Sequence, residues 1–181
     1  MIETKRLILR PWRLTDAEAL YEVAKDPEIG TRAGWPPHTS VDNSREVIEA
    51  VFMNDTTYAI CEQGSDRVIG CVGLMIGDMS NFKLPPNEGE LGYWIGVPYW
   101  GRGYTTEACQ ALVQWGFETL GLEKIWAGAF EDNTASQRVQ EKCGLTLHHV
   151  NEHSPWADNA ADQAKKEIIR CLTRTEWLKQ H

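Results

Sequence analysis

Hydrophobic and polar positions along the chain follow two different periods, which indicates a protein built from both helices and strands. Apolar residues recur at helical spacing over about residues 15–25, 41–53, 105–120 and 133–143. Alternating or continuously apolar runs predict strands at Leu7–Trp12, Thr57–Cys61, Val68–Ile76, Gly89–Val97, Ile125–Phe130, Leu145–Val150 and Glu167–Leu172. The order β-α-α-β-β-β-α-β-α-β-β predicts a mixed sheet with helices between its strands.

Short motifs at the ends of the first helices refine this pattern. Thr15 followed by Glu18 has the spacing of a capping box, so Thr15 is expected to cap the first helix. The segment Gly30–Thr39 is predicted to be a loop, because it contains the breakers Gly34, Pro36 and Pro37.

Length and composition predict one globular domain spanning residues 1–181, with neither linker nor repeat. The 18 Lys and Arg residues against 26 Asp and Glu residues give a net charge of −8. Nucleic-acid binding needs clustered positive charge, so no such partner is expected. No apolar run approaches the roughly 18 residues that cross a bilayer, so no membrane partner is expected either. The five widely spaced cysteines are typical of reduced thiols in a cytoplasmic protein.

The candidate chemistry lies where the strand Gly89–Val97 meets the next helix. The connecting loop contains Gly101 and Gly103, and the helix begins near Thr105. Backbone N–H groups converge at a helix start and the helix dipole adds about half a positive charge, so such a loop can bind a phosphate. Glycines let the backbone approach the phosphate, and Arg102 can add a direct contact. A tight turn without any ligand is the alternative.

Two common phosphate-binding motifs do not fit this loop. A P-loop requires Lys-Ser or Lys-Thr after its glycines, and neither pair follows here. A dinucleotide-binding loop requires a third glycine, and Thr106 occupies that position. The ligand must therefore be identified from the residues around the loop.

Those residues resemble a known family. The segments Glu90–Ile95 and Tyr99–Ala108 resemble the acetyl-CoA motif of the GNAT N-acetyltransferase superfamily. Within it, they are similar to the RimJ/RimL-like branch, the ribosomal-protein N-terminal acetyltransferases. Asn133–Ser136, followed by Glu141–Gly144, matches the second signature of that branch, and Leu7–Pro11 resembles its opening strand. The resemblance covers nearly the whole chain.

Two positions depart from the family pattern. Pro98 stands where the superfamily has Arg or Gln, a change that this branch tolerates. Leu145 stands where an aromatic residue is usual, which is expected to alter packing near the CoA arm.

The resemblance implies the GNAT acyl-CoA N-acyltransferase fold. This is a mixed α/β (α+β) fold whose central sheet is mixed, mostly antiparallel, splayed between two strands and flanked by helices. It implies acetyl-CoA as co-substrate and no metal. The residues implied to contact CoA are Ile95, Gly96, Val97, Gly101, Arg102, Gly103, Tyr104, Thr105, Thr106, Asn133 and Ser136.

The implied reaction is direct attack of an amine on the thioester. Glu90 is the candidate base, because a carboxylate usually accepts the proton that the amine must lose. The N–H of Val97 is the candidate oxyanion donor, with Gly96 permitting a bulge. Ser136 is the candidate acid for the leaving thiolate. The alternatives are a solvated Glu90 on an edge strand, and a Ser136 that only occupies the N3 position of a helix capped by Asn133.

The expected acceptor is a primary amine, either on a small molecule or at a protein N-terminus. A polyamine or aminoglycoside acetyltransferase is one alternative, mildly favoured by the acidic charge, and a non-catalytic acyl-CoA sensor is another. The choice of acceptor is expected to depend on three loops, Gly30–Thr39, Gly77–Asn87 and Asn151–Lys165. None of them contains a motif that identifies the acceptor. A homodimer is a further option, because dimers are frequent in the family.

Overall fold

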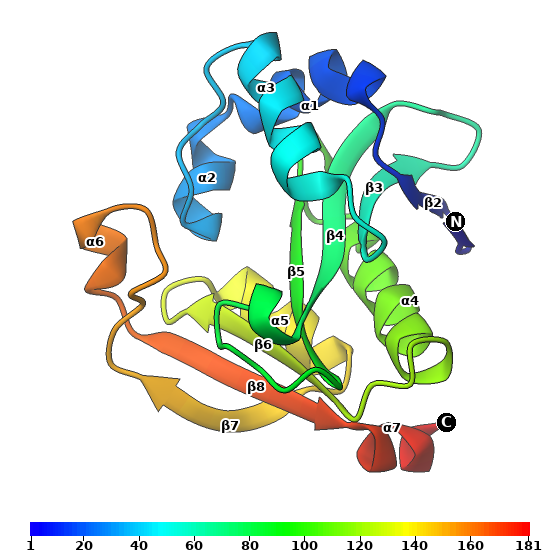
Figure 1. Cartoon of the computed structure of the whole chain (residues 1–181), viewed down its shortest axis with the longest axis vertical. Coiled ribbons are helices and arrows are strands. Elements are labelled where there is room, and N and C mark those ends of the chain that lie inside the picture. Colours follow the sequence, from blue (N-terminus) through cyan, green and yellow to red (C-terminus); the bar gives the residue numbers. More distant parts are fainter. The chain divides into compact units, whose positions relative to one another are not determined.

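A computed structural model describes residues 1–181, and its eight strands form one sheet in the order β1-β2-β3-β4-β5-β6-β8-β7 (Figure 1). The strand β5 pairs with β6 in parallel, whereas β1–β2, β2–β3, β3–β4, β6–β8 and β7–β8 are antiparallel. The predicted mixed, mostly antiparallel sheet is therefore confirmed. The strands are β1 (Ile2–Glu3), β2 (Leu7–Pro11), β3 (Thr57–Glu62), β4 (Val68–Ile76), β5 (Glu88–Ile95), β6 (Lys124–Phe130), β7 (Thr146–Asn151) and β8 (Glu167–Thr173).

Seven α-helices accompany the sheet, together with short 3-10 turns. A π-helical segment, Ile48–Phe52, continues α3. None of the helices is both long and apolar enough to cross a membrane. The helices are α1 (Ala17–Ala24), α2 (Pro27–Ala33), α3 (Val41–Val47), α4 (Tyr104–Glu118), α5 (Thr134–Lys142), α6 (Ala160–Gln163) and α7 (Arg174–Gln180).

The chain divides into two compact units. Unit 1 comprises Met1–Gly73 and Tyr93–Ala111, and unit 2 comprises Leu74–Gly92 and Leu112–His181. Three elements, β4, β5 and α4, contribute residues to both units. The single domain over residues 1–181 stays a prediction.

The core of unit 1 is formed by one face of β3 and β4 and by the helices α1 and α3, which lie side by side (Figure 1). Helix α1 buries Ala17, Leu20 and Ala24, and this i, i+3, i+7 spacing is the apolar stripe that its sequence predicts. The rings of Trp12 and Phe52 close one side of the core, with centroids 4.8 Å apart.

A buried ion pair ties β2 to the start of α1. Arg10 is 3% exposed and donates to both carboxylate oxygens of Asp16, at 2.9 and 2.8 Å. Its Nε also donates to the exposed Asp66, at 2.7 Å. Bidentate geometry of this kind offsets the cost of removing the two charges from water.

Unit 2 packs the second half of α4, the helices α5 and α7, and β6, β8 and β7 into its own core (Figure 1). Gly116 in α4 permits close packing, because a Cβ there would lie 2.9 Å from Leu74. The rings of Phe117 and Trp177 lie 5.4 Å apart. Helix α5 is attached to β6, where the Gln140 side chain donates to the Gly128 carbonyl at 3.1 Å.

Two predictions about the first helices are wrong. Thr15 does not cap α1: it lies exposed in the 3-10 turn Leu14–Asp16, and the Asp16 carboxylate instead accepts from the Arg13 N–H at 2.9 Å. Gly30–Thr39 is not entirely a loop, because α2 extends to Ala33. Asp26 caps that helix, Pro27 occupies its first turn, and Gly34 ends it at a φ of 84°.

Other elements lie within two residues of their predicted bounds, while β1, α6 and α7 were not predicted. All five cysteines are free thiols and all are buried, as expected for reduced core residues. Burial raises the pKa of Cys71 to about 12 and that of Cys171 to about 11.

Replacing Asp16 by alanine is expected to destabilise the protein by about 3–5 kcal/mol, because it leaves the buried Arg10 charge without its bidentate partner. Asp66→Ala is the matched control, since Asp66 is 70% exposed and its loss should have a much smaller effect. Urea denaturation of the two variants measures the difference. Equal losses would contradict this account of the ion pair.

Candidate active site

The loop between β5 and α4 has the backbone geometry that its glycines predict. Gly101 and Gly103 have φ values of 73° and 77°, in the left-handed region that favours glycine. A Cβ placed on Gly101 would meet no heavy atom within 4 Å, so the backbone is open to an approaching group at this position. Helix α4 begins at Tyr104, and the first N–H groups of a helix have no intrahelical acceptor.

Trp100 fixes the first half of this loop. Its indole Nε1 donates to the Ile95 carbonyl at 2.9 Å, and its backbone N–H donates to Val97 at 3.1 Å. The guanidinium of Arg32 lies over the Trp100 ring, 4.4 Å from its centroid. The loop is therefore held from within and is positioned by the end of β5.

Arg6 and Glu107 fix the second half of the loop. Arg6 donates to the Arg102 carbonyl at 2.8 Å and to the Glu107 carboxylate at 2.7 Å. Thr4 donates to the same carboxylate at 2.7 Å. Partial burial acts to raise the pKa of Glu107, but the Thr4 and Arg6 donors outweigh it and lower that pKa. The loop thus has a second cationic side chain, Arg6, that sequence analysis did not single out.

Gly96 serves close packing in this structure. Its φ of −57° and ψ of 141° are accessible to any residue, and its N–H donates to the Ile69 carbonyl at 2.8 Å. A Cβ there would lie 3.0 Å from the side chain of Val23, which explains the glycine. Val97 follows as the first residue of a 3-10 turn.

In unit 2, the side chain of Glu90 is buried and hydrogen-bonded. Glu90 is 7% exposed, and its carboxylate accepts from the Ser80 hydroxyl at 2.7 Å. It also accepts from the backbone N–H and the side-chain amide of Asn81, at 2.8 and 3.2 Å. Glu90 is therefore not a solvated residue, which removes the alternative interpretation of this position.

Burial raises the pKa of Glu90, and the hydrogen bonds from Ser80 and Asn81 only partly offset that rise. Burial penalises the charged carboxylate, whereas donors stabilise it. A carboxyl group with a raised pKa is a stronger base than a free glutamate, so the environment suits a group that must accept a proton.

Ser136 and Asn133 belong to the start of α5. Asn133 is the N-cap, and its side chain accepts from the Ser136 backbone N–H at 3.2 Å. The predicted cap is confirmed, and the Ser136 side chain is half-buried. The cap engages the backbone N–H of Ser136 and not its hydroxyl group.

A second buried carboxyl group, Glu167, was missed by sequence analysis. It is 1% exposed and lies opposite Phe130 in the β6–β8 register. Burial raises the pKa of Glu167 and the charge of Glu90 raises it further, while the nearby Trp156 and Asn151 side chains act in the opposite direction. Only the tertiary fold brings Glu90 and Glu167 into electrostatic contact, so no local pattern could have revealed the pair.

The candidate residues fall into two groups, one in each unit. Unit 1 brings together the end of β5, the loop and the start of α4: Ile95, Gly96, Val97, Gly101, Arg102, Gly103, Tyr104, Thr105 and Thr106. Unit 2 contains Glu90, Asn133 and Ser136.

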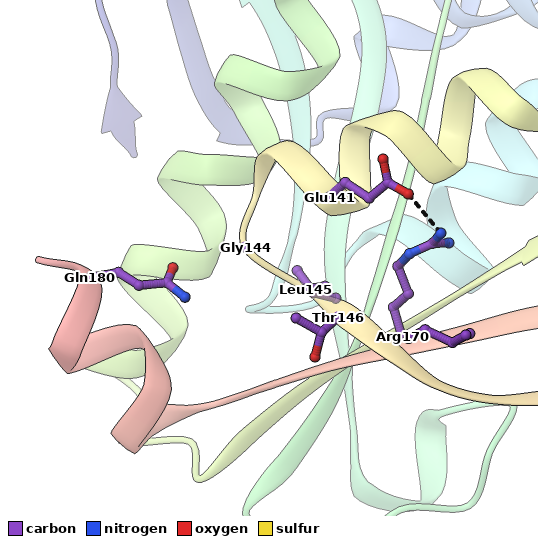
Figure 2. A pocket seen from close by; sticks show the side chains of 7 residues that line it. Glu141, Gly144, Leu145, Thr146, Arg170 and Gln180 are labelled. Carbon is purple, nitrogen blue, oxygen red and sulfur yellow. Dashed lines mark hydrogen bonds and ion pairs between the residues drawn. The ribbon is translucent and has the colours of Figure 1, made fainter.

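Unit 2 also has an open pocket of about 470 Å³ between α5, α7 and the start of β7, which contains none of the candidate residues (Figure 2). Arg170 points from β8 toward α5 and forms an ion pair with Glu141 at 2.8 Å. Gln140 accepts a further hydrogen bond from Arg170, at 3.4 Å. These contacts give Arg170 a structural role. The buried Leu145, which departs from the family pattern, lines this pocket.

A family model described as an acetyltransferase (GNAT) domain matches residues 6–146. The chain belongs to the GNAT acetyltransferase family. The uncharacterized N-acetyltransferase p20 of Bacillus licheniformis is 34% identical over 143 residues, which cover 75% of this chain and 76% of p20. The FsC-acetyl coenzyme A-N(2)-transacetylase of Aspergillus fumigatus is 33% identical, covering 98% of this chain and 78% of that protein. This GNAT protein is accordingly an N-acetyltransferase, an acyltransferase enzyme.

Solved structures of GNAT proteins share the fold. An acetyltransferase of the GNAT family from Bacillus anthracis has a TM-score of 0.83 at 22% identity, covering 97% of this chain and 99% of that one. A spermidine N-acetyltransferase from Vibrio cholerae, solved with CoA and spermine, has a TM-score of 0.76 at 16% identity, covering 95% and 98%. At these identities the likeness establishes the fold alone.

The Ser80→Ala variant of this GNAT protein is expected to raise the pKa of Glu90 further. The Ser80 hydroxyl stabilises the charged carboxylate, so its removal favours the protonated form. An NMR titration of the Glu90 side-chain carboxyl carbon measures the shift. Ser65→Ala, in the turn between β3 and β4, should leave the titration unchanged. A lower pKa in Ser80→Ala would show that this hydrogen bond does not act on the carboxylate.

Proposed function

We propose that this GNAT protein transfers the acetyl group of acetyl-CoA to a primary amine, on a small molecule or at a protein N-terminus. The observation that carries the proposal is the loop Gly101–Gly103, whose two left-handed glycines directly precede the 15-residue helix α4. In a GNAT protein, this geometry is suited to the pyrophosphate of CoA.

The chemistry of the loop fits a bound pyrophosphate. The open backbone at Gly101 admits a phosphate oxygen, and the N-terminal dipole of α4 favours negative charge. Arg102 belongs to the loop, and the guanidinium group of Arg6 donates to the Arg102 carbonyl; arginine is well suited to phosphate recognition. Thr105 and Thr106 in the first turn of α4 supply further N–H and hydroxyl donors.

Glu90 is the proposed base. A carboxylate has about four acceptor positions, and three are occupied by Ser80 and Asn81, so one is left for the proton of the attacking amine. Acetyl-CoA supplies an acetyl thioester, whose carbonyl carbon forms the new C–N bond and whose C–S bond then breaks. Glu90 takes the amine proton and makes the nitrogen lone pair available.

Ser136 is the proposed acid, and the backbone N–H of Val97 is the proposed oxyanion donor. The hydroxyl group of Ser136 would give a proton to the departing thiolate, and solvent would restore that proton. The backbone N–H of Val97 would donate to the oxyanion that forms during transfer. The helical cap at Asn133 supports the Ser136 role, because it fixes the backbone from which the hydroxyl group projects.

The comparisons also bear on the acceptor. The Vibrio cholerae neighbour is described as a spermidine acetyltransferase, and the Aspergillus relative as a transacetylase that uses acetyl coenzyme A. The description of the Aspergillus relative supports acetyl-CoA as donor and an amine acceptor, whereas the Vibrio cholerae neighbour, at 16% identity, supports the fold alone. The polyamine alternative gains support from Glu90 and Glu167, two of the four buried carboxyl residues of unit 2.

Gly101→Ala is expected to raise the KM for acetyl-CoA at least tenfold, because a Cβ would occupy the open approach to the backbone. Gly64→Ala is a matched control: Gly64 has a φ of 81°, equally open surroundings and a position in the β3–β4 turn. Both variants should lose about 1 kcal/mol of stability from backbone strain. Steady-state kinetics and urea denaturation measure the two effects, and an unchanged KM in Gly101→Ala would argue against the phosphate role.

Glu90→Gln is expected to lower kcat about 10²–10⁴-fold, the usual contribution of a general base. In the wild type, kcat/KM should rise with pH as Glu90 ionises, with a midpoint above the ordinary glutamate pKa because burial raises it. This rise of kcat/KM with pH should be absent in Glu90→Gln. Thiol release from acetyl-CoA, followed across a panel of amines and peptides from pH 5 to 9, measures both effects. Full activity in Glu90→Gln would assign the base to another group.

A further inference from the structure

Arg6 lies outside the loop Gly101–Gly103, yet its side chain is fixed against that loop from three directions. Its Nε donates to the Glu107 carboxylate at 2.7 Å, and its Nη1 donates to the Arg102 carbonyl at 2.8 Å. Its guanidinium carbon lies 4.6 Å from the centroid of the Tyr104 ring. All of these residues belong to unit 1, so the arrangement is internal to one compact unit.

The guanidinium group of Arg6 keeps donors that these contacts do not use. A guanidinium group has five N–H donors, one on Nε and two on each Nη. The two hydrogen bonds take one donor from Nε and one from Nη1, and Nη2 takes part in neither. Nη2 lies 3.4 Å from the position that a Cβ on Gly103 would occupy. The side chain is 42% exposed, so a ligand at the loop can reach it.

Glu107 orients the Arg6 side chain. Its carboxylate accepts from the backbone N–H and from the Nε of Arg6, each at 2.7 Å, and from the Thr4 hydroxyl at 2.7 Å. Partial burial acts to raise the pKa of Glu107, but these donors outweigh it and lower that pKa, so the ion pair persists at neutral pH. Because the carboxylate holds the Nε edge of the guanidinium group, Nη2 is left on the side of Gly103.

Arg102 adds a second guanidinium group to the same loop. Its guanidinium carbon lies 5.5 Å from the centroid of the Tyr99 ring, and an aromatic face attracts a guanidinium group without neutralising its charge. The charge of Arg6, in contrast, is balanced by Glu107. Two guanidinium groups at one loop suit a ligand with several charged oxygens, because an arginine can donate to two oxygens at once.

We propose that Nη2 of Arg6 donates to the pyrophosphate of CoA and that Glu107 is the residue that positions it. This inference rests on the proposed function, in which the loop Gly101–Gly103 binds that pyrophosphate, and it adds a side chain from the segment between β1 and β2. Hydrogen bonds between charged groups are stronger than neutral ones, and a side chain that is held in place before binding loses little conformational freedom. Arg6 therefore contributes to coenzyme affinity and not to the chemical step.

The kinetic test compares acetyl-CoA with S-acetylpantetheine, which carries the same thioester and no phosphate. Arg6→Ala should raise the KM for acetyl-CoA about 10–100-fold, the effect of one hydrogen bond to a charged group, and should leave kcat unchanged. The KM and kcat for S-acetylpantetheine should not change, which also shows that the variant is folded. Lys5→Ala is the matched control, because it removes the same charge from an exposed neighbouring residue and should leave both KM values unchanged. Equal increases for the two thioesters would overturn the inference.

Glu107→Gln tests the positioning role. This change keeps the shape of the side chain but weakens its hold on the Arg6 Nε, so the KM for acetyl-CoA should rise several-fold. The same change made in Arg6→Ala should have little effect, because residues that act as a unit are not additive. A lower KM in Glu107→Gln would show that the carboxylate only repels the coenzyme, and additive losses would show that it acts independently of Arg6. Either result would overturn the positioning role.

Calorimetry with CoA, 3′-dephospho-CoA and pantetheine measures the contact without catalysis. The wild type should bind the two pyrophosphate compounds much more tightly than pantetheine, and Arg6→Ala should weaken the binding of both to the same extent. A loss confined to CoA would assign Arg6 to the 3′-phosphate and would overturn the pyrophosphate contact. Equal binding of all three compounds by the wild type would overturn the proposed function of the loop. A wild-type preference that Arg6→Ala retains would overturn this inference alone.

Discussion

The short parallel pairing of β5 with β6 determines which side chains of unit 2 can take part in chemistry. Its register places Glu90 opposite Trp126 and Gly89 opposite Ile125. A shift by one residue would exchange the two faces of β5 and would move Glu90 away from Ser80 and Asn81. Gly89 opposes such a shift, because a Cβ at this position would lie 2.9 Å from the Ile76 side chain and 3.2 Å from that of Leu122, and both side chains would have to move. The environment of Glu90, and with it the proposed base, follows from this packing.

Much of the fold was predictable because its signals are local. The period of the apolar residues and the helix breakers located the strands and most helices. Left-handed Gly144 directly follows the C-cap of α5, and left-handed Gly121 lies three residues after the end of α4. The errors arose where one residue had competing partners. Thr15 had the right spacing for a cap, but the buried Arg10 fixed Asp16 and the turn began earlier. Asp26 followed by Pro27 has the pattern of a helix start, but Gly34, Pro36 and Pro37 shortly after it led to the prediction of a loop instead of the short helix α2.

The candidate site also has parts that local sequence motifs could predict and parts that depend on long-range packing. The loop Gly101–Gly103 and the cap at Asn133 are contiguous motifs, so sequence alone could locate them. Arg6 and Glu107 are separated by about a hundred residues, and no spacing rule connects them. The sequence around Glu167 predicts an ordinary strand residue. Its carboxyl group is buried against Gly128 and Trp156, which lie in other parts of the unit 2 sequence. Long-range packing therefore supplied what the local patterns lacked.

The burial of the cysteines has a practical consequence for enzymology. All five cysteines are at most 8% exposed, and burial raises the pKa of Cys61, Cys71 and Cys171, so those three thiols stay protonated near neutral pH. Thiolates rather than thiols attack disulfide reagents. The folded protein should therefore react very slowly with such reagents. In an assay that follows turnover with a coloured disulfide reagent, the signal would come from free coenzyme A alone.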